Sequence, residues 1–170
     1  MRHTAVATAW RGRCYGQSDV ALSRAGAAAI TPLAAKLCEY RPDLIIHSGL
    51  NRTRLLAQLV GLAVADKCWQ ERNFGAWEGQ SWAAIYRASG SAMDGMINAP
   101  DRFRPGGGET TFELAERVSA ALARLPAHQT TLVITHGGPI AAILGTRAGL
   151  HPRDWLALVP PFGGIVMLSD

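Results

Sequence analysis

The chain has 170 residues, is 48% hydrophobic and carries a formal net charge of +4. This length suits one domain with a real core, and the apolar fraction argues against disorder. No apolar run approaches the ~20 residues that a membrane span needs, and polar residues follow Met1 at once, so we expect neither a membrane anchor nor a secretory signal. The 3 cysteines are scattered and form no C-x-x-C pair, which predicts reduced thiols in a cytoplasmic protein.

Most of the positive side chains are arginines, whose planar guanidinium group suits phosphate or carboxylate. The arginines form no run and few aromatic residues interleave with them. The sequence therefore gives no support for nucleic acid as a partner.

The first predicted elements are a helical stretch and a buried strand. Ser23 is expected to cap a helix over residues 24–40. Pro32 falls inside this stretch and should kink it or split it into two helices. The apolar run at 43–48 ends in polar residues, which is typical of a buried strand.

The middle of the chain predicts shorter elements. Leucines at helical spacing predict a helix over 51–63, with Asn51 as its cap. A weaker strand, near an edge of the sheet, is expected over 64–69, and a short helix over 81–88. The Gly-, Pro- and Asp-rich stretch 90–109 predicts a long surface loop.

The last third contains the clearest local signals. Thr110 and Glu113 form a capping box for a helix that runs to residue 125. Residues 130–135 predict a buried strand, and residues 164–168 predict a final one. Neither repeats nor a linker interrupt the alternation of strands and helices. We therefore expect a single α/β domain over 1–170, a three-layer sandwich with a mainly parallel sheet flanked by helices.

Each of the two clearest strands runs into a residue that suits an anion, Arg52 after the first and His136 after the second. Ligands of open α/β sheets bind beyond the carboxyl ends of strands, where helix N-termini offer free N–H groups. Arg2 and His3 would join them if the start of the chain reaches the same edge. Two arginines and two histidines around one site suit a phosphoryl group.

Several motifs carry a family resemblance. They are "RHT" at 2–4, "HSGLNRTR" at 47–54, "ERNFGAWEG" at 71–79, "PGGGET" at 105–110 and "THGG" at 135–138. In this order they resemble the histidine phosphatase superfamily, also called the phosphoglycerate mutase-like family. The resemblance covers nearly the whole chain and implies that family's fold, with neither a metal nor a cofactor.

The resemblance also implies a mechanism. His3 would attack phosphorus and form a phosphohistidine, and Glu71 would protonate the leaving oxygen. His136 would be a third catalytic residue that holds a phosphoryl oxygen. The expected substrate-binding residues are Arg2, Arg52, Thr8 and Gly137. Glu78 and Glu109 remain alternatives to Glu71 as the acid, and Arg54 is the alternative to Arg52.

Two further segments narrow the resemblance. They are "CYGQSDVAL" at 14–22 and "HPRDWLALVPPFGGIVML" at 151–168, and both resemble the α-ribazole phosphatase branch, which acts in cobalamin nucleotide-loop assembly. The implied function is hydrolysis of a small phosphomonoester, α-ribazole 5'-phosphate in particular. Neither nucleic acid nor a membrane is an expected partner, and a homodimer remains open.

The sequence departs from the family pattern at its start. Family members have a glycine after the nucleophile and an asparagine shortly after it, where this chain has Thr4 and Ala9. They also begin with a hydrophobic strand, so we expect the first strand to be truncated or missing and the native chain to carry apolar residues before Met1. The alternative function is that of a catalytically impaired relative that binds a phosphorylated ligand or partner. A mutase is less favoured, because the chain is shorter than usual for that branch.

Overall fold

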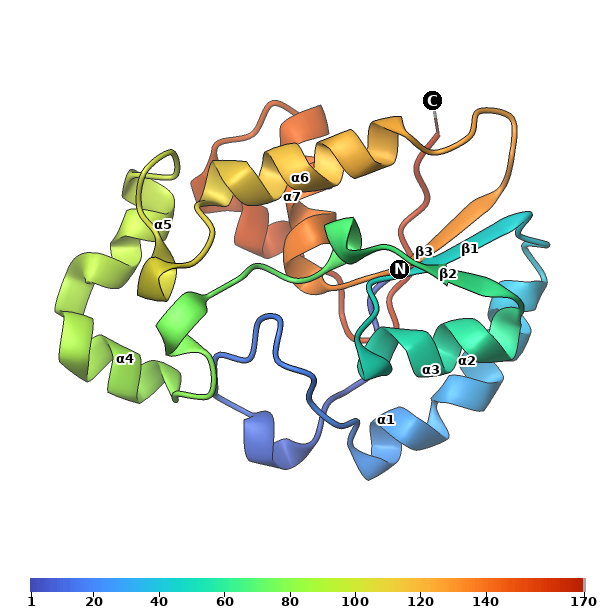
Figure 1. Ribbon diagram of the computed structural model, residues 1–170, viewed down its shortest axis with the longest axis horizontal. Coiled ribbons are helices and arrows are strands. Elements are labelled where there is room, and N and C mark those ends of the chain that lie inside the picture. Colours follow the sequence, from blue (N-terminus) through green and yellow to red (C-terminus); the bar gives the residue numbers. More distant parts are fainter. Residues whose placement is uncertain (170) are drawn as a thin grey trace.

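The computed structural model describes residues 1–169 and shows helices on both faces of a parallel sheet (Figure 1). The sheet is three-stranded, with the order β2-β1-β3. The central strand β1 (Leu44–His47) pairs in parallel with β2 (Ala63–Ala65) and with β3 (Thr131–Ile134). The predicted α/β class is therefore confirmed, and the weak strand near residue 64 does lie at an edge. Within residues 1–169, no helix has both the length and the apolar character needed to cross a bilayer.

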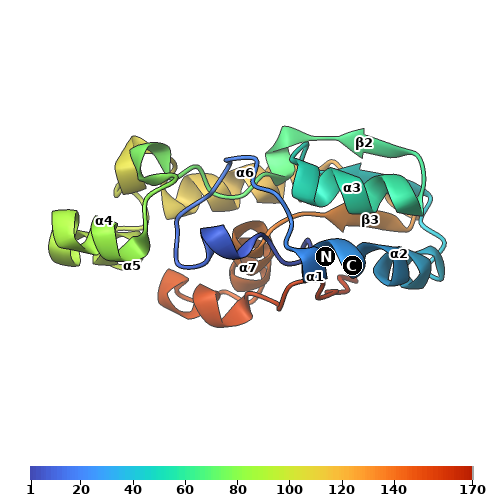
Figure 2. The ribbon, with the colours of Figure 1, turned by 90° about the horizontal axis from the view of Figure 1, so that it is seen from below.

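The core is divided into two clusters by the sheet. Alternate strand residues point to opposite faces, so Ile46 and Val133 pack on one cluster and Ile45 and Ile134 on the other. Figure 2 gives a second view of these layers. The helices over the first face are α6 (Thr111–Ala123) and α7 (Gly137–Arg147); those over the second are α2 (Ile30–Cys38) and α3 (Asn51–Val60).

The first predicted helix is split, as expected from Pro32. One residue, Ala29, separates α1 (Arg24–Ala28) from α2, and Ser23 caps α1 by accepting a hydrogen bond from the Gly26 N–H. A proline has no N–H for the carbonyl four residues earlier, and its ring crowds that carbonyl. The break at residue 29 follows from this missing bond.

The helix α3 does not have the predicted cap. Asn51 is its first helical residue, and the Asp19 carboxylate accepts the Asn51 N–H at 2.8 Å. The prediction failed because the capping group comes from a distant segment. By contrast, the predicted capping box of Thr110 and Glu113 is confirmed at the start of α6.

The segment 90–109, expected as a loop, contains short helical turns. After α4 (Trp82–Ser89), which was predicted, come a 3-10 turn at Gly90–Asp94, the helix α5 (Gly95–Asn98) and another 3-10 turn at Pro105–Gly107. The Thr111 hydroxyl donates to the Met96 carbonyl at 2.8 Å, which ties α5 to the start of α6. Tertiary contacts therefore order a stretch whose composition is typical of loops. Figure 1 shows α4 and α5 together at one end of the molecule.

The predicted strand at 164–168 is wrong, because these residues form no strand. Within residues 1–169, the backbone bonds to the start of the chain involve Gly163 and Gly164: Gly164 accepts from the Arg2 N–H, and the Gly163 N–H donates to His3, both at 3.0 Å. A strand needs a paired neighbour along its length. Here that neighbour is the segment of residues 1–3, which forms only an isolated parallel bridge between Arg2 and Thr135 within residues 1–169.

Candidate active site

The first residues of the chain lie between β3 and the C-terminal segment. The Met1 nitrogen donates to the Val133 carbonyl at 2.6 Å, the Thr135 N–H donates to Met1, and the His3 N–H donates to Thr135. On its opposite edge, the segment is held by the backbone hydrogen bonds of Arg2 and His3 to residues 163–164. Both edges of the segment are thus fixed, and His3 is delivered to the carboxyl end of β3.

His3 has a defined tautomer. Its Nδ1 lies 2.7 Å from the Thr4 carbonyl, which can only accept, so Nδ1 carries the proton and Nε2 keeps its lone pair. Burial lowers the pKa of His3 to about 3, and the charges of Arg52 and Arg2 act in the same direction. The imidazole is therefore neutral near pH 7, with one nitrogen available as a nucleophile.

Arg52 and His136 are in direct contact beneath His3. Both are 0% exposed, and the Arg52 Nε–H donates to His136 Nδ1 at 3.3 Å. The His3 and His136 rings lie 5.1 Å apart between centroids. Burial is the main reason that the pKa of His136 lies well below its usual value, and the Arg52 charge adds to it. The expected meeting of the two strand ends is thus present in the structure.

The Arg52 guanidinium is oriented by a loop between Tyr15 and Ser18. Its two Nη groups donate to the Gly16 and Ser18 carbonyls, both at 2.6 Å, and its carbon lies 5.4 Å from the Tyr15 ring centroid. With the bond to His136, three of the five N–H donors of a guanidinium are occupied. The other two N–H groups make no hydrogen bond within residues 1–169.

Arg2 contacts Pro160 and Phe162, and the Phe162 ring also lies beside that of His3. Its Nη1 donates to the Pro160 carbonyl at 2.8 Å, and its guanidinium carbon lies 4.0 Å from the Phe162 ring centroid. Its buried Nε has no hydrogen-bond partner among residues 1–169. Because an unpaired buried donor is costly, this nitrogen favours an anionic ligand at the site.

Glu71 reaches the same cluster from a different segment. Its carboxylate accepts the Gly138 N–H in the first turn of α7 (3.1 Å) and its Oε1 also accepts the Arg72 N–H (3.0 Å). A Cβ at Gly138 would overlap Oε1 of Glu71, so the glycine permits this close approach. Gly137, the first residue of α7, lies against Arg2, because a Cβ placed there would be 3.5 Å from the Arg2 guanidinium carbon.

The two other candidate acids have structural partners. Glu78 accepts hydrogen bonds from the N–H groups of Gln17 (3.0 Å), Ser18 (2.8 Å) and Phe74 (3.2 Å). Glu109 forms an ion pair with Arg117, at 2.7 Å between Oε1 and Nε. Among residues 1–169, neither carboxylate is bonded to the start of α7, whereas Glu71 is bonded to Gly138, two residues after His136, so Glu71 remains the best candidate for the acid.

Thr8 makes no hydrogen bond to the cluster within residues 1–169, and its expected substrate contact stays a prediction. It is exposed and begins a 3-10 turn at Thr8–Trp10, and none of the hydrogen bonds in residues 1–169 joins its hydroxyl to the residues around His3. Thr4 is buried instead, and its hydroxyl has no partner within the same residues.

Sequence reasoning missed three neighbours of the cluster: Ser48, Tyr15 and Phe162. Ser48 directly follows β1 and contacts His136, Tyr15 lies over Arg52, and the Phe162 ring lies 5.5 Å from that of His3. A signal existed for Ser48, since it lies at a strand end where ligands bind. No local pattern indicates the other two.

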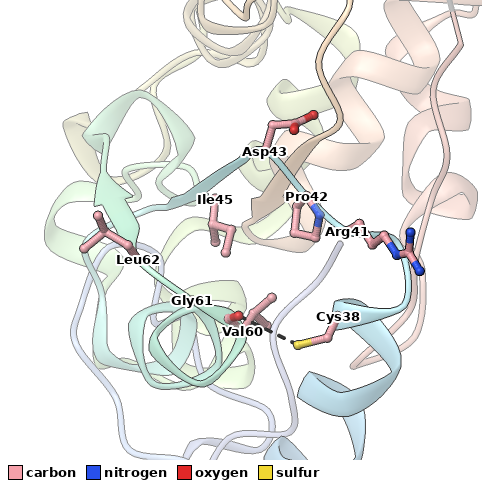
Figure 3. A pocket seen from close by; sticks show the side chains of 8 residues that line it. All are labelled: Cys38, Arg41, Pro42, Asp43, Ile45, Val60, Gly61 and Leu62. Carbon is pink, nitrogen blue, oxygen red and sulfur yellow. Dashed lines mark hydrogen bonds between the residues drawn. The ribbon is translucent and has the colours of Figure 1, made fainter.

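A separate cavity of about 350 Å³ lies away from this cluster (Figure 3). It is bounded by Cys38 at the end of α2, Asp43 before β1, and Leu62 after α3. These residues lie at the amino end of β1. The catalytic candidates lie at the carboxyl ends of the strands, so this cavity is not part of their site.

Comparisons with known proteins find one family model and several relatives that match most of the chain. The model of the histidine phosphatase superfamily (branch 1) matches residues 1–168. A probable phosphoglycerate mutase, GpmB, of Yersinia enterocolitica is 30% identical over 156 residues, which are 86% of this chain and 73% of that protein. GpmB of Escherichia fergusonii is 29% identical over 84% of this chain and 71% of that protein.

Solved structures show the same fold. A mycobacterial glucosyl-3-phosphoglycerate phosphatase has a TM-score of 0.82 and 25% identity, over 95% of this chain and 84% of that chain. The α-ribazole phosphatase of Shigella flexneri has a TM-score of 0.82 and 21% identity, over 96% of this chain and 85% of that chain. At 21% identity, the likeness to the α-ribazole phosphatase shows a shared fold alone.

Proposed function

This chain belongs to the histidine phosphatase superfamily, and we propose that it is a phosphomonoester hydrolase that acts through a phosphohistidine at His3. The observation that carries the proposal is the state of His3. It is a buried, neutral imidazole with its proton on Nδ1, and it lies beside His136 and in the field of Arg52 and Arg2. A neutral imidazole with a free lone pair is a nucleophile, and the neighbouring positive charges attract a phosphate dianion to it.

In the first step, Nε2 of His3 attacks phosphorus and the bond from phosphorus to the ester oxygen breaks. Glu71 gives a proton to that leaving oxygen. The imidazole becomes positively charged, and the Thr4 carbonyl continues to accept its Nδ1–H. Arg2 and Arg52 stabilise the negative charge on the phosphoryl oxygens.

In the second step, water attacks phosphorus and the P–N bond breaks. Glu71, now ionised, takes a proton from that water. Inorganic phosphate leaves and His3 returns to its neutral form. The steps require no group beyond the residues of the cluster and water.

For the substrate, we propose α-ribazole 5'-phosphate, which would place the protein in cytoplasmic cobalamin biosynthesis. The support is the segment 14–22, which resembles the α-ribazole phosphatase branch in sequence. In the structure its Gly16 and Ser18 carbonyls orient Arg52. The segment that resembles this branch is thus also the one that shapes the phosphate side of the site.

The test is a panel of phosphomonoesters assayed for phosphate release with and without EDTA: α-ribazole 5'-phosphate, glucosyl-3-phosphoglycerate and 3-phosphoglycerate. We expect release that EDTA does not reduce, with the highest kcat/KM for α-ribazole 5'-phosphate. Binding without release would favour the impaired relative. Transfer of phosphate within phosphoglycerate, rather than to water, would favour a mutase.

A further inference from the structure

A chain of buried hydroxyl groups leads from His136 into the backbone of α3. His136 Nε2 lies 2.8 Å from the Ser48 hydroxyl, and that hydroxyl lies 2.9 Å from the Thr53 hydroxyl. Thr53 in turn donates to the Leu50 carbonyl at 2.8 Å. Ser48, Thr53 and His136 are each 0% exposed, so water does not compete for these bonds.

Both ends of this chain fix its direction. The Leu50 carbonyl can only accept, so the Thr53 hydroxyl donates to it and accepts from Ser48. Ser48 has then used its proton and must accept from His136 Nε2–H. At the other end, the Arg52 Nε–H can only donate, so His136 Nδ1 must be the unprotonated nitrogen. The Leu50 carbonyl and the Arg52 Nε–H therefore require the same tautomer of His136, with the proton on Nε2.

We propose that Ser48, held by Thr53, is a positioning residue that fixes the Nε2–H tautomer of His136. The basic nitrogen of His136 is then Nδ1, on the side of Arg52 and the phosphoryl group. Its link to turnover rests on the proposed function: when a dianion binds, Nδ1 takes a proton from water, releases the Arg52 Nε–H and donates to a phosphoryl oxygen, while Ser48 keeps the Nε2–H. Ser48 acts through His136 and does not touch substrate.

Substitutions distinguish this positioning role from a role in which Ser48 and Thr53 only fill space in the core. Ser48→Ala removes the acceptor for Nε2–H and keeps nearly the same volume, whereas Ser48→Thr keeps the hydroxyl. Thr53→Val removes the orienting hydroxyl, and Thr53→Ser restores it. Thr111→Val is a matched control, because Thr111 is also a buried threonine whose hydroxyl donates to a carbonyl, but it lies at the start of α6.

The direct measurement is a long-range proton–nitrogen NMR correlation of the His136 ring in the protein without substrate. We expect a protonated Nε2 and an unprotonated Nδ1 in the wild type and in Thr111→Val. In Ser48→Ala the shorter bond of the ring, at 2.8 Å, is lost and only the longer one from the Arg52 Nε–H, at 3.3 Å, is left, so we expect the ring to populate both tautomers. A wild-type ring with its proton on Nδ1 would overturn the proposal even if every variant failed to fold.

Kinetics give the second readout. Removing the partner that orients a metal-bound histidine costs on the order of 10- to 100-fold, and we expect a loss of that order in kcat for Ser48→Ala, with KM little changed. Ser48→Thr and Thr53→Ser should retain most of kcat. Ser48→Ala with an unchanged tautomer and an unchanged kcat would overturn the proposal. A wild type with the expected tautomer but no turnover of any phosphomonoester would support the positioning and contradict the proposed function.

Discussion

Arg52 donates its Nε–H to Nδ1 of His136 at 3.3 Å, although the two residues are 84 positions apart in the chain. Arg52 is the second residue of α3, after β1, and His136 directly precedes α7, after β3, so the contact joins the carboxyl ends of two neighbouring parallel strands. The guanidinium and the imidazole are joined by a direct hydrogen bond, so each side chain restricts the position of the other beside the proposed anion site. Changes to Arg52 should therefore affect both phosphate binding and His136.

The first prediction concerns Arg52→Ala. The variant removes charge-assisted hydrogen bonds, each worth roughly 1.5–3 kcal/mol, and leaves the Gly16 and Ser18 carbonyls without their donor. We expect KM to rise, kcat to fall, and vanadate to inhibit more weakly. The control is Arg54→Ala, since the Arg54 side chain bonds to Asn51 and Gln58 of its own helix. Equal losses at both positions would contradict the site.

The second prediction separates the candidate acids. Glu71→Gln keeps the shape of the side chain and removes its proton, so hydrolysis of alkyl phosphates should fall much more than hydrolysis of nitrophenyl phosphate. Glu78→Gln should instead lower Tm, because Glu78 accepts N–H groups from two loops. A plot of log kcat against leaving-group pKa is the measurement. A uniform loss in Glu71→Gln would remove Glu71 from the acid role.

The third prediction is a dependence of stability on pH. The pKa of folded His3 is about 3 against an ordinary value of 6.5, so below pH 6.5 the unfolded chain binds a proton that the folded chain does not. The stability of the folded state is therefore complete above pH 6.5 and is lost as the pH falls toward 3. One such group contributes a slope of up to about 1.4 kcal/mol per pH unit.

Urea unfolding between pH 7 and pH 4 measures this slope. His3→Gln should show a shallower loss of stability than the wild type, while His128→Gln, which alters an exposed histidine, should keep the wild-type slope. A residual slope is expected from His136, whose pKa is also lowered by burial. Identical slopes in the wild type and His3→Gln would show that His3 is not buried in its neutral form.

Local signals in the sequence predicted much of the fold. The capping box at Thr110, the break caused by Pro32 and the two apolar strands depend on neighbouring residues, and all of them are present. The final strand failed because an apolar run does not specify a pairing partner. The cap of α3 failed because its acceptor, Asp19, lies 32 positions away.

The placement of most candidate side chains was predictable, and their roles stay predictions. Arg2, His3, Arg52, Glu71 and His136 gather as the resemblance implies, with Gly137 beside them. The carbonyls that orient Arg52 belong to the backbone, which has no sequence signature. Thr8 was proposed as a substitute for a missing asparagine; it lies on an exposed 3-10 turn, and its contact with substrate stays a prediction.

The central claim is that His3 carries the phosphoryl group during turnover, and rapid-quench labelling tests it most directly. Wild-type protein is mixed with a phosphomonoester labelled in its phosphate, quenched in alkali within milliseconds, and mapped by peptide. The account predicts an acid-labile, alkali-stable phosphoryl group on the peptide that contains His3, and no label in His3→Ala, whose turnover should also be abolished. Turnover at the wild-type rate in His3→Ala, or label on another residue, would contradict it.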